Sequence, residues 1–270
     1  MKISVVVPSL GGDLRRIIDS VNRGSMIPSE IIVCLPNNSH TVESVDHCDN
    51  LKVVYAGRYG QVYQRAVGFK AAKGDYVLQL DDDILLDKGC LERLLCALEQ
   101  LPEKTSVSPC LFNVNGLPMY QQKKTGILSI YYRLINGKLG YQPGAITQAG
   151  TNFGVNPAET KEDLIQVDWL PGGCVLHRKE NLILIDYYPN KGKAYCEDLI
   201  HSYLLRQSGI ALFVDTRAKC TTPLNPRLSL MKDLVPDIKA RHYFVKLANL
   251  SMVRMWIHYV VYVVRFLKFK

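Results

Sequence analysis

The chain has 270 residues, a mass of 30.5 kDa and a mean hydropathy of −0.01. These values are ordinary for a soluble globular protein that forms one large α/β domain, alone or with an appendage. The formal net charge of +8 is unevenly spread, since residues 239–270 contain seven Lys or Arg residues and no acidic residue. Such a local excess indicates an anionic partner, which could be a membrane surface, a nucleic acid or a phosphorylated substrate.

The eight cysteines form no C-x-x-C pair and have no ordered histidine spacing. The sequence therefore predicts neither a zinc site nor a disulfide framework, and most of these cysteines are expected to be small buried hydrophobes in a reducing compartment. The apolar run of residues 1–8 is too short for a signal peptide and is typical of a first strand. We expect a cytoplasmic protein.

The first third of the chain alternates between strands and helices. Strands are predicted at 3–7, 30–35, 51–55 and 76–80, and helices at 13–21, 61–72 and 91–101. This alternation favours a mostly parallel sheet with helices on both faces and ligands at the carboxyl ends of the strands.

The second half is less regular. Residues 112–166 are rich in Gly, Pro, Asn and Gln, and we expect loops there, including a lid on the acceptor side. Order returns at 167–177, followed by a helix at 197–208 and a strand at 210–214.

Three adjacent carboxylates, Asp81, Asp82 and Asp83, follow the apolar strand at 76–80 directly. They repel one another unless a cation or a set of donors offsets them. We expect a divalent metal held by Asp81 and Asp83, which strand alternation would point to the same side. Oxygen ligands favour Mg²⁺ or Mn²⁺. The alternative is a solvated acidic turn that caps the next helix.

With this triplet, several segments resemble family 2 of the GT-A glycosyltransferases. They are Ser-Val-Val-Val-Pro-Ser at 4–9, the helix and strand at 60–77 with Arg65, Leu-Asp-Asp-Asp at 80–83, Trp-Leu-Pro-Gly-Gly-Cys through Arg at 169–178, and Glu-Asp-Leu at 197–199 leading to 204–209. The resemblance covers roughly residues 2–215. Each motif is common alone, but five in this order are specific.

The resemblance implies a nucleotide-sugar donor, a metal that bridges its diphosphate to Asp81 and Asp83, and an inverting single displacement. A metal stabilises the charge that grows on the leaving diphosphate, and a carboxylate must take the proton of the attacking hydroxyl. In the family this base is the Asp of the Glu-Asp motif, which matches Asp198. Glu197 would orient a neighbour or contact the acceptor. Alternatively, both acids only complement the dipole of the helix that they begin.

The remaining substrate-binding residues that we expect are Pro8, Ser9, Arg65, Asp82, Trp169, Gly172 and Gly173. Arg65 is a candidate for phosphate contact. The adjacent glycines would let the backbone approach a ligand closely, or would simply form a tight turn. Trp169 offers either a face for a sugar ring or a side chain for the core.

Two departures from the family pattern concern the donor. An acidic pair usually follows the second strand, where this chain has Asn37 and Asn38, whose amides could still bond a base edge. Many members also have a metal-ligating histidine where this chain reads Ala-Lys-Cys-Thr-Thr-Pro at 218–223. We therefore expect metal binding to rest on Asp83 and phosphate oxygens.

Residues 248–270 predict a basic amphipathic helix. At about 100° per residue, Ser251, Arg254 and His258 gather with two further basic residues on one side, and apolar residues cover the rest. The ionisable residues argue against a spanning helix and favour one lying in the membrane interface. The alternative is a helix docked on the catalytic domain.

We therefore expect a GT-A catalytic domain at 1–225 and a basic amphipathic helical segment, associated with the membrane, at 226–270. The expected function is transfer of a sugar from a nucleotide-sugar donor to a glycan or lipid-linked acceptor, in surface polysaccharide synthesis at the inner face of the cell membrane. The alternatives are a nucleotidyltransferase, whose Gly-rich phosphate loop matches 11–15 poorly, and a non-catalytic nucleotide-sugar-binding or scaffold protein. Beyond charge, no motif supports nucleic-acid binding.

Overall fold

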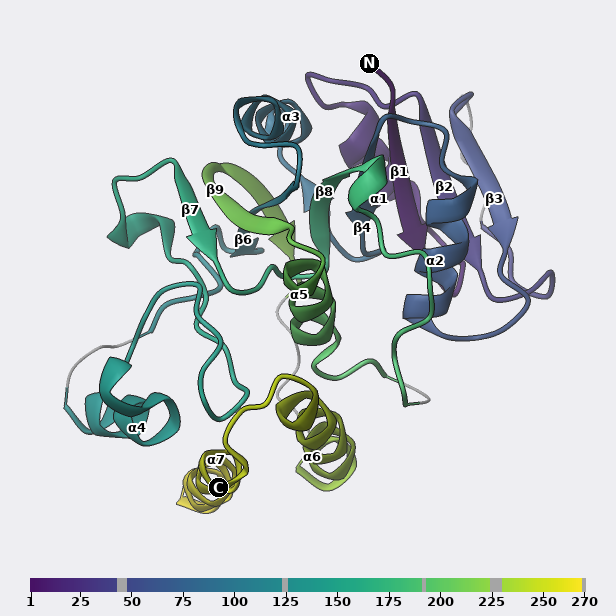
Figure 1. Ribbon diagram of the computed structural model, residues 1–270. Coiled ribbons are helices and arrows are strands. Elements are labelled where there is room, and N and C mark those ends of the chain that lie inside the picture. Colours follow the sequence, from purple (N-terminus) through teal and green to yellow (C-terminus); the bar gives the residue numbers. More distant parts are fainter. Residues whose placement is uncertain (43–47, 123–125, 191–192, 224–229, 269–270) are drawn as a thin grey trace.

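The computed structural model describes residues 1–42, 48–122, 126–190, 193–223 and 230–268. A single sheet with strand order β3-β2-β1-β4-β8-β6-β9-β5 runs through the molecule, and β7 pairs with β9 (Figure 1). The helices lie on both faces of this sheet, which confirms the predicted α/β fold class.

One half of the sheet is parallel. It contains β1 (Ile3–Pro8), β2 (Glu30–Leu35), β3 (Leu51–Tyr55) and β4 (Tyr76–Leu80), all pairing in parallel. Every residue of β1, β2 and β4 is buried, because helices cover both faces of these strands. Strands buried on both faces appear in a sequence as continuous apolar runs, which is why their bounds were predicted closely.

The other half of the sheet is mixed. The strand β8 (Cys174–Arg178) runs antiparallel between β4 and β6 (Thr105–Asn113). Next to it, β6 pairs in parallel with the long strand β9 (Ala211–Thr222). The short strands β5 (Leu85–Leu86) and β7 (Leu164–Val167) pair antiparallel with β9. Predicted order at 167–177 and 210–214 thus corresponds to β8 and to the start of β9.

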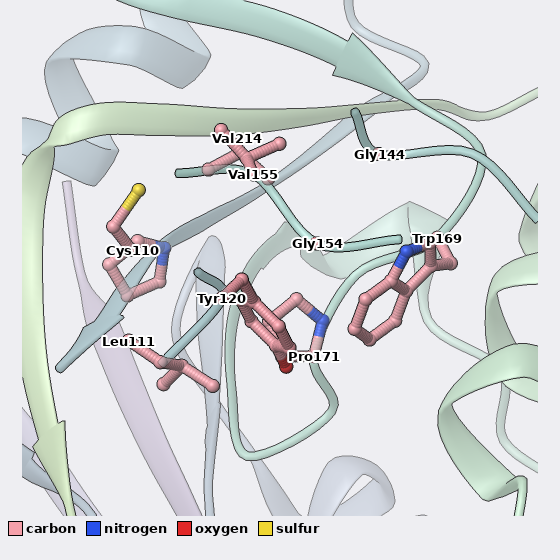
Figure 2. Close-up of a pocket in the computed structure, with 10 residues that line it drawn as sticks. Cys110, Leu111, Tyr120, Gly144, Gly154, Val155, Trp169, Pro171 and Val214 are labelled. Atoms are coloured by element: carbon pink, nitrogen blue, oxygen red, sulfur yellow. The ribbon is translucent and has the colours of Figure 1, made fainter. Parts of the chain in front are cut away.

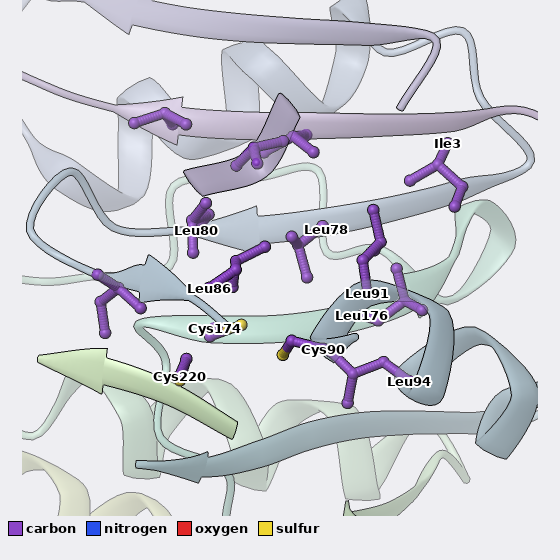
Figure 3. Close-up of a cluster of buried hydrophobic side chains, with 14 of the residues drawn as sticks. Ile3, Leu78, Leu80, Leu86, Cys90, Leu91, Leu94, Cys174, Leu176 and Cys220 are labelled. Carbon is purple, nitrogen blue, oxygen red and sulfur yellow. The ribbon is translucent and has the colours of Figure 1, made fainter. Parts of the chain in front are cut away.

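Two helices cover each face of the sheet. On one face, α1 (Arg15–Asn22) and α3 (Cys90–Gln100) pack on Leu78, Leu80 and Leu176 (Figure 3). On the opposite face, α2 (Gln61–Ala71) packs on β1 and β2, and α5 (Glu197–Gln207) packs near β9. All eight cysteines are free thiols, and Cys90, Cys174 and Cys220 lie buried in the core that Figure 3 shows.

The expectation that 112–166 consists of loops is wrong in part. The segment contains the helix α4 (Ile127–Asn136) and two short 3-10 helices, Gly137–Leu139 and Pro157–Glu159. A further 3-10 helix, Lys179–Asn181, follows β8. Tyr132 and Ile135 of α4 are buried against Phe153, so this segment has a small apolar core of its own. Glycines frame the helix and mask its signal in the sequence.

Two C-terminal helices complete the structure. They are α6 (Leu230–Leu247) and α7 (Met252–Lys268), joined through Asn249 in a left-handed conformation (φ 53°). Phe244 is fully buried with α5 residues, and Val245 is buried with Met255 and Tyr259. The expected boundary at 225/226 lies outside the described residues. Within the described residues, no helix combines the length and the apolar character needed to cross a membrane.

Candidate active site

The acidic triplet lies where β4 ends. The strand stops at Leu80, and Asp82 and Asp83 form a turn, closed by a bond of 3.2 Å from the Ile84 N–H to the Asp81 carbonyl. Asp81 and Asp83 are thus not related by strand alternation, and that premise of the sequence prediction is wrong. Asp82 accepts a 2.6 Å hydrogen bond from the hydroxyl of Ser9, which follows β1. The carboxyl ends of β1 and β4 therefore meet here.

A buried arginine links this turn to the Glu-Asp motif. Arg65 of α2 donates to Glu197 Oε1 at 2.6 Å and to Asp81 Oδ1 at 3.2 Å. Gln61, one helical turn before Arg65, donates to the same Asp81 oxygen at 3.0 Å. A buried guanidinium forms paired hydrogen bonds with carboxylates because its donors have fixed directions. Arg65 thus contacts protein carboxylates here rather than an open phosphate site.

The two glycines lie between these carboxylates. A Cβ atom at Gly172 would lie 2.3 Å from Asp198 Oδ1, and one at Gly173 would lie 3.5 Å from Asp81 Oδ2. The Gly173 carbonyl accepts from the Asp81 N–H at 2.8 Å, and the Gly172 carbonyl accepts from the Gln79 side chain. The absence of a Cβ atom at Gly172 is what lets Asp198 approach this backbone segment, whereas a Cβ atom at Gly173 would clash with Ile84 at 2.7 Å.

Glu197 and Asp198 begin α5, and their surroundings shift the pKa values of the two carboxyl groups in opposite directions. Burial, followed by the charge of Glu197 and their shared hydrogen bond, raises the pKa of Asp198 well above its usual value. Burial alone would raise the pKa of Glu197 too, but the charge of Arg65 and the hydrogen bond from Tyr187 outweigh it and lower that pKa. Glu197 is therefore the ionised partner, and Asp198 retains its proton to a higher pH than an ordinary aspartic acid.

The acidic turn carries charge that a cation would relieve. Burial raises the pKa of Asp81 to about 6, and burial with the repulsion of Asp82 raises the pKa of Asp83. Among the described residues no three metal-ligating side chains converge, so a metal here would take one or two protein carboxylates. Mg²⁺ and Mn²⁺ are commonly bound in this way, with substrate phosphates and waters completing the shell. Carboxylate oxygens at an exposed turn fit such an ion.

The loop after β2 brings further residues to the same edge of the sheet. Asn37 Oδ1 accepts from the Ser39 N–H at 3.0 Å and lies 2.9 Å from His40 Nδ1, while Asn38 is exposed. The Tyr59 hydroxyl lies 3.3 Å from His40 Nε2. Asn37 therefore organises the loop, and Asn38 is the freer amide. The sequence prediction missed His40 and Tyr59, for which no motif gives a signal.

Trp169 is buried and lines a small apolar cavity, so its ring does not present an open face to solvent. Its indole is 4% exposed and donates to the Phe153 carbonyl at 2.8 Å. Tyr120 meets it edge to face, with 5.7 Å between ring centroids (Figure 2). Pro171 and Gly154 line the same cavity. Of the two expected roles, this arrangement corresponds to packing in the core.

Two buried rings, those of Tyr187 and His201, lie beside Glu197. The Tyr187 hydroxyl donates to Glu197 Oε1, and its ring stacks on His201 with 5.5 Å between centroids. Burial lowers the pKa of His201 to about 4, so this ring is neutral near pH 7. Sequence reasoning missed both residues. His201 lies one turn after Glu197 on α5, a spacing that could have indicated it, whereas Tyr187 comes from an irregular segment without a signal.

The architecture is an α/β fold of the GT-A type, with carboxylates at the carboxyl ends of its parallel strands. The model of a family described as "Glycosyl transferase family 2" matches residues 4–154. This match covers more than half of the chain, which therefore belongs to glycosyl transferase family 2. The assignment favours sugar transfer over the nucleotidyltransferase and non-catalytic alternatives.

Solved structures give a similar fold. A crystal structure of GalNAc-T7 with UDP, GalNAc and Mn²⁺ superposes with a TM-score of 0.56 at 17% identity, over 84% of this chain and 44% of that one. S. aureus TarS gives a TM-score of 0.47 at 18% identity, over 89% of this chain and 39% of that one. The chain thus spans less than half the length of either protein. No curated protein matches the sequence.

Proposed function

We propose that this protein is a glycosyltransferase that moves a sugar from a nucleoside-diphosphate sugar to a hydroxyl of a glycan or lipid-linked acceptor, with inversion at the anomeric carbon. The observation that carries the proposal is the placement of Gly172 and Gly173 between Asp81 and Asp198. In this arrangement Asp81 flanks the backbone segment on the side where the donor is proposed to bind, and Asp198 flanks it on the side of the acceptor.

The donor is proposed to bind along the carboxyl ends of β1, β2 and β4. Ser9 and Asp82 already contact each other there, and Asn38 is the exposed amide at the end of β2. Asp83, with Asp81 beside it, would hold Mg²⁺ or Mn²⁺. That cation would offset the charge that develops on the leaving diphosphate. The solved GalNAc-T7 complex, similar in fold, contains UDP and Mn²⁺, which supports this choice of ligands.

Asp198 is proposed to be the base. The acceptor oxygen forms the new bond to the anomeric carbon while the bond to the diphosphate breaks, and the hydroxyl proton passes to the Asp198 carboxylate. Glu197 has a different task, because Arg65 and Tyr187 hold it as an ionised, buried carboxylate. The negative charge of Glu197 raises the pKa of Asp198, which makes Asp198 a stronger base, and the bonds of Glu197 to Arg65 and Tyr187 fix the start of α5.

The setting is proposed to be the synthesis of a surface polysaccharide at the inner face of the cell membrane. Supporting this are the run of residues 239–270 without an acid and the exposed apolar side chains of α7, among them Trp256 and Val260. In this view 1–225 is the catalytic domain and 226–270 carries the membrane-associated helices, although Phe244 anchors them firmly to α5.

The experiment that tests the proposal is a thermal-shift screen of nucleotide sugars with and without Mn²⁺. A ligand that binds the native state raises the melting temperature by mass action. We expect at least one nucleoside-diphosphate sugar to raise it, and to do so more with Mn²⁺ than without. A panel that gives no shift under either condition would count against donor binding.

A further inference from the structure

A second helix lies beside α7, although the sequence separates the two widely. The Tyr131 hydroxyl of α4 and His258 Nδ1 of α7 are 2.6 Å apart, 127 positions from each other in the chain. Arg254 of α7 donates to the main-chain carbonyls of Arg133 and Leu134, in the last turn of α4. Figure 1 shows α4 and α7 at the same end of the molecule, away from the sheet. The two helices are therefore one structural unit.

Each of these helices has an exposed apolar stripe at helical spacing. We call the two stripes together the α4–α7 surface; it consists of Ile127, Ile130, Leu134, Val253, Trp256, Val260 and Val264. On α4 the buried residues Tyr132 and Ile135 point to the opposite side, and on α7 Met255 and Tyr259 do the same. At about 100° per residue, both stripes thus face away from the catalytic core. Large apolar areas exposed in this way mark interaction sites.

The charged residues of α4 and α7 themselves are all cationic, and the acids of the neighbouring helix α6 are Asp233 and Asp237. Residues 104–158, which contain α4, include five Lys or Arg residues and no acid, and residues 238–270 include seven and no acid. Arg133, Lys138 and Lys246 are exposed. The nearest acid before α7, Asp237, is bonded to Arg241 and Tyr259. Apolar stripes bordered by cations complement an anionic lipid surface, whereas a second copy would bring cations against cations.

We propose that α4 and α7 together dock on a bilayer that contains anionic lipid, with both apolar stripes in the boundary between headgroups and acyl chains. This rests on the proposed membrane placement of α7 and adds that α4 carries a comparable share of the contact. Two adjacent helices also fix the orientation of the protein, since α7 packs on α6 and α6 packs on α5, which carries Asp198.

The test uses the full chain and three single variants. Ile130→Gln and Val260→Gln each remove one apolar contact from the two halves of the surface. Ile27→Gln is the matched control, because Ile27 is 64% exposed and Ile130 is 63% exposed, but Ile27 lies between α1 and β2. Co-sedimentation is measured with vesicles of phosphatidylcholine alone and mixed with phosphatidylglycerol, in low and high salt.

We expect the native chain and Ile27→Gln to bind the anionic vesicles equally, and each of the other variants to bind roughly tenfold more weakly. High salt should weaken native binding. If Ile130→Gln binds the anionic vesicles as strongly as the native chain does, α4 has no role in membrane binding. The proposal would also be overturned if the native chain did not bind vesicles but formed dimers that Ile130→Gln dissociates. Vesicle binding is measured without donor, so a failure of sugar transfer is detected separately by nucleoside diphosphate release.

Discussion

Arg65 and Glu197 form an ion pair of 2.6 Å in which their side chains are only 2% and 4% exposed. The pair joins α2 to the start of α5, and through the second Arg65 bond it also holds Asp81. It therefore ties the proposed donor side of the site to the proposed acceptor side. A buried pair of this kind is costly to break, because the remaining partner stays charged in a poorly solvated place.

Glu197→Gln should therefore destabilise the protein by about 3–5 kcal/mol, measured as the free energy of unfolding in urea. The matched control is Arg23→Gln, which breaks the exposed pair of Arg23 with Asp19 and should cost less than about 1 kcal/mol. If both variants unfold with native stability, Arg65 and Glu197 do not form the buried link described here.

Gly172→Ala should impair turnover more than folding. The new methyl group would lie 2.3 Å from Asp198 Oδ1 and 3.1 Å from Glu197 Oε2, so the Asp198 side chain would have to shift. Displacing the base should lower kcat by roughly 10²-fold, since a shift of about 1 Å can cost that much. Gly89→Ala is the control, because the nearest atom to its methyl group would be 3.9 Å away. Equal rates for both variants would contradict the placement of Asp198.

Asp83→Ala should remove the gain in nucleoside diphosphate affinity that Mn²⁺ provides. Asp82 and Asp83 are both exposed in the acidic turn, but Asp82 accepts a hydrogen bond from Ser9, and protein ligands to such ions are few. Calorimetry with and without Mn²⁺ gives the gain directly. Asp87→Ala, which removes an exposed carboxylate four residues later, should keep it. A native affinity that is the same with and without metal would contradict the metal site.

The rate should rise with pH as Asp198 loses its proton. Its pKa is raised by burial and by Glu197, so the basic form appears at a higher pH than for an ordinary aspartic acid. In Glu197→Gln the negative charge is gone, and the rising limb of kcat/KM should move to lower pH. An unmoved limb would mean that the titrating group is not Asp198.

Much of the fold could be predicted from the sequence because burial leaves a pattern. Strands β2 and β4 were predicted with their observed bounds, since both faces of each strand are covered. The helix α4 was missed because it lies in a stretch rich in Gly, Pro, Asn and Gln, and Gly126 and Gly137 stand at its two ends.

The carboxylates of the candidate site could be identified from the sequence, but their arrangement in space could not. Order along the chain indicated Asp81 and Asp198, yet the hydrogen bond that Asp82 accepts in the turn comes from Ser9, which is 73 positions away. Tyr187 reaches Glu197 from a segment without regular structure. Contacts of this kind arise from tertiary packing, which single-sequence patterns do not record.

The most direct test of the proposed displacement is a comparison of Asp198→Asn with the native protein, with donor affinity and turnover measured in the same preparation. The substitution keeps the shape of the side chain and removes its ability to accept a proton. We predict donor affinity near the native value and nucleoside diphosphate release reduced by roughly 10²-fold or more in the presence of acceptor. Release within a few-fold of the native rate would show that Asp198 is not the base.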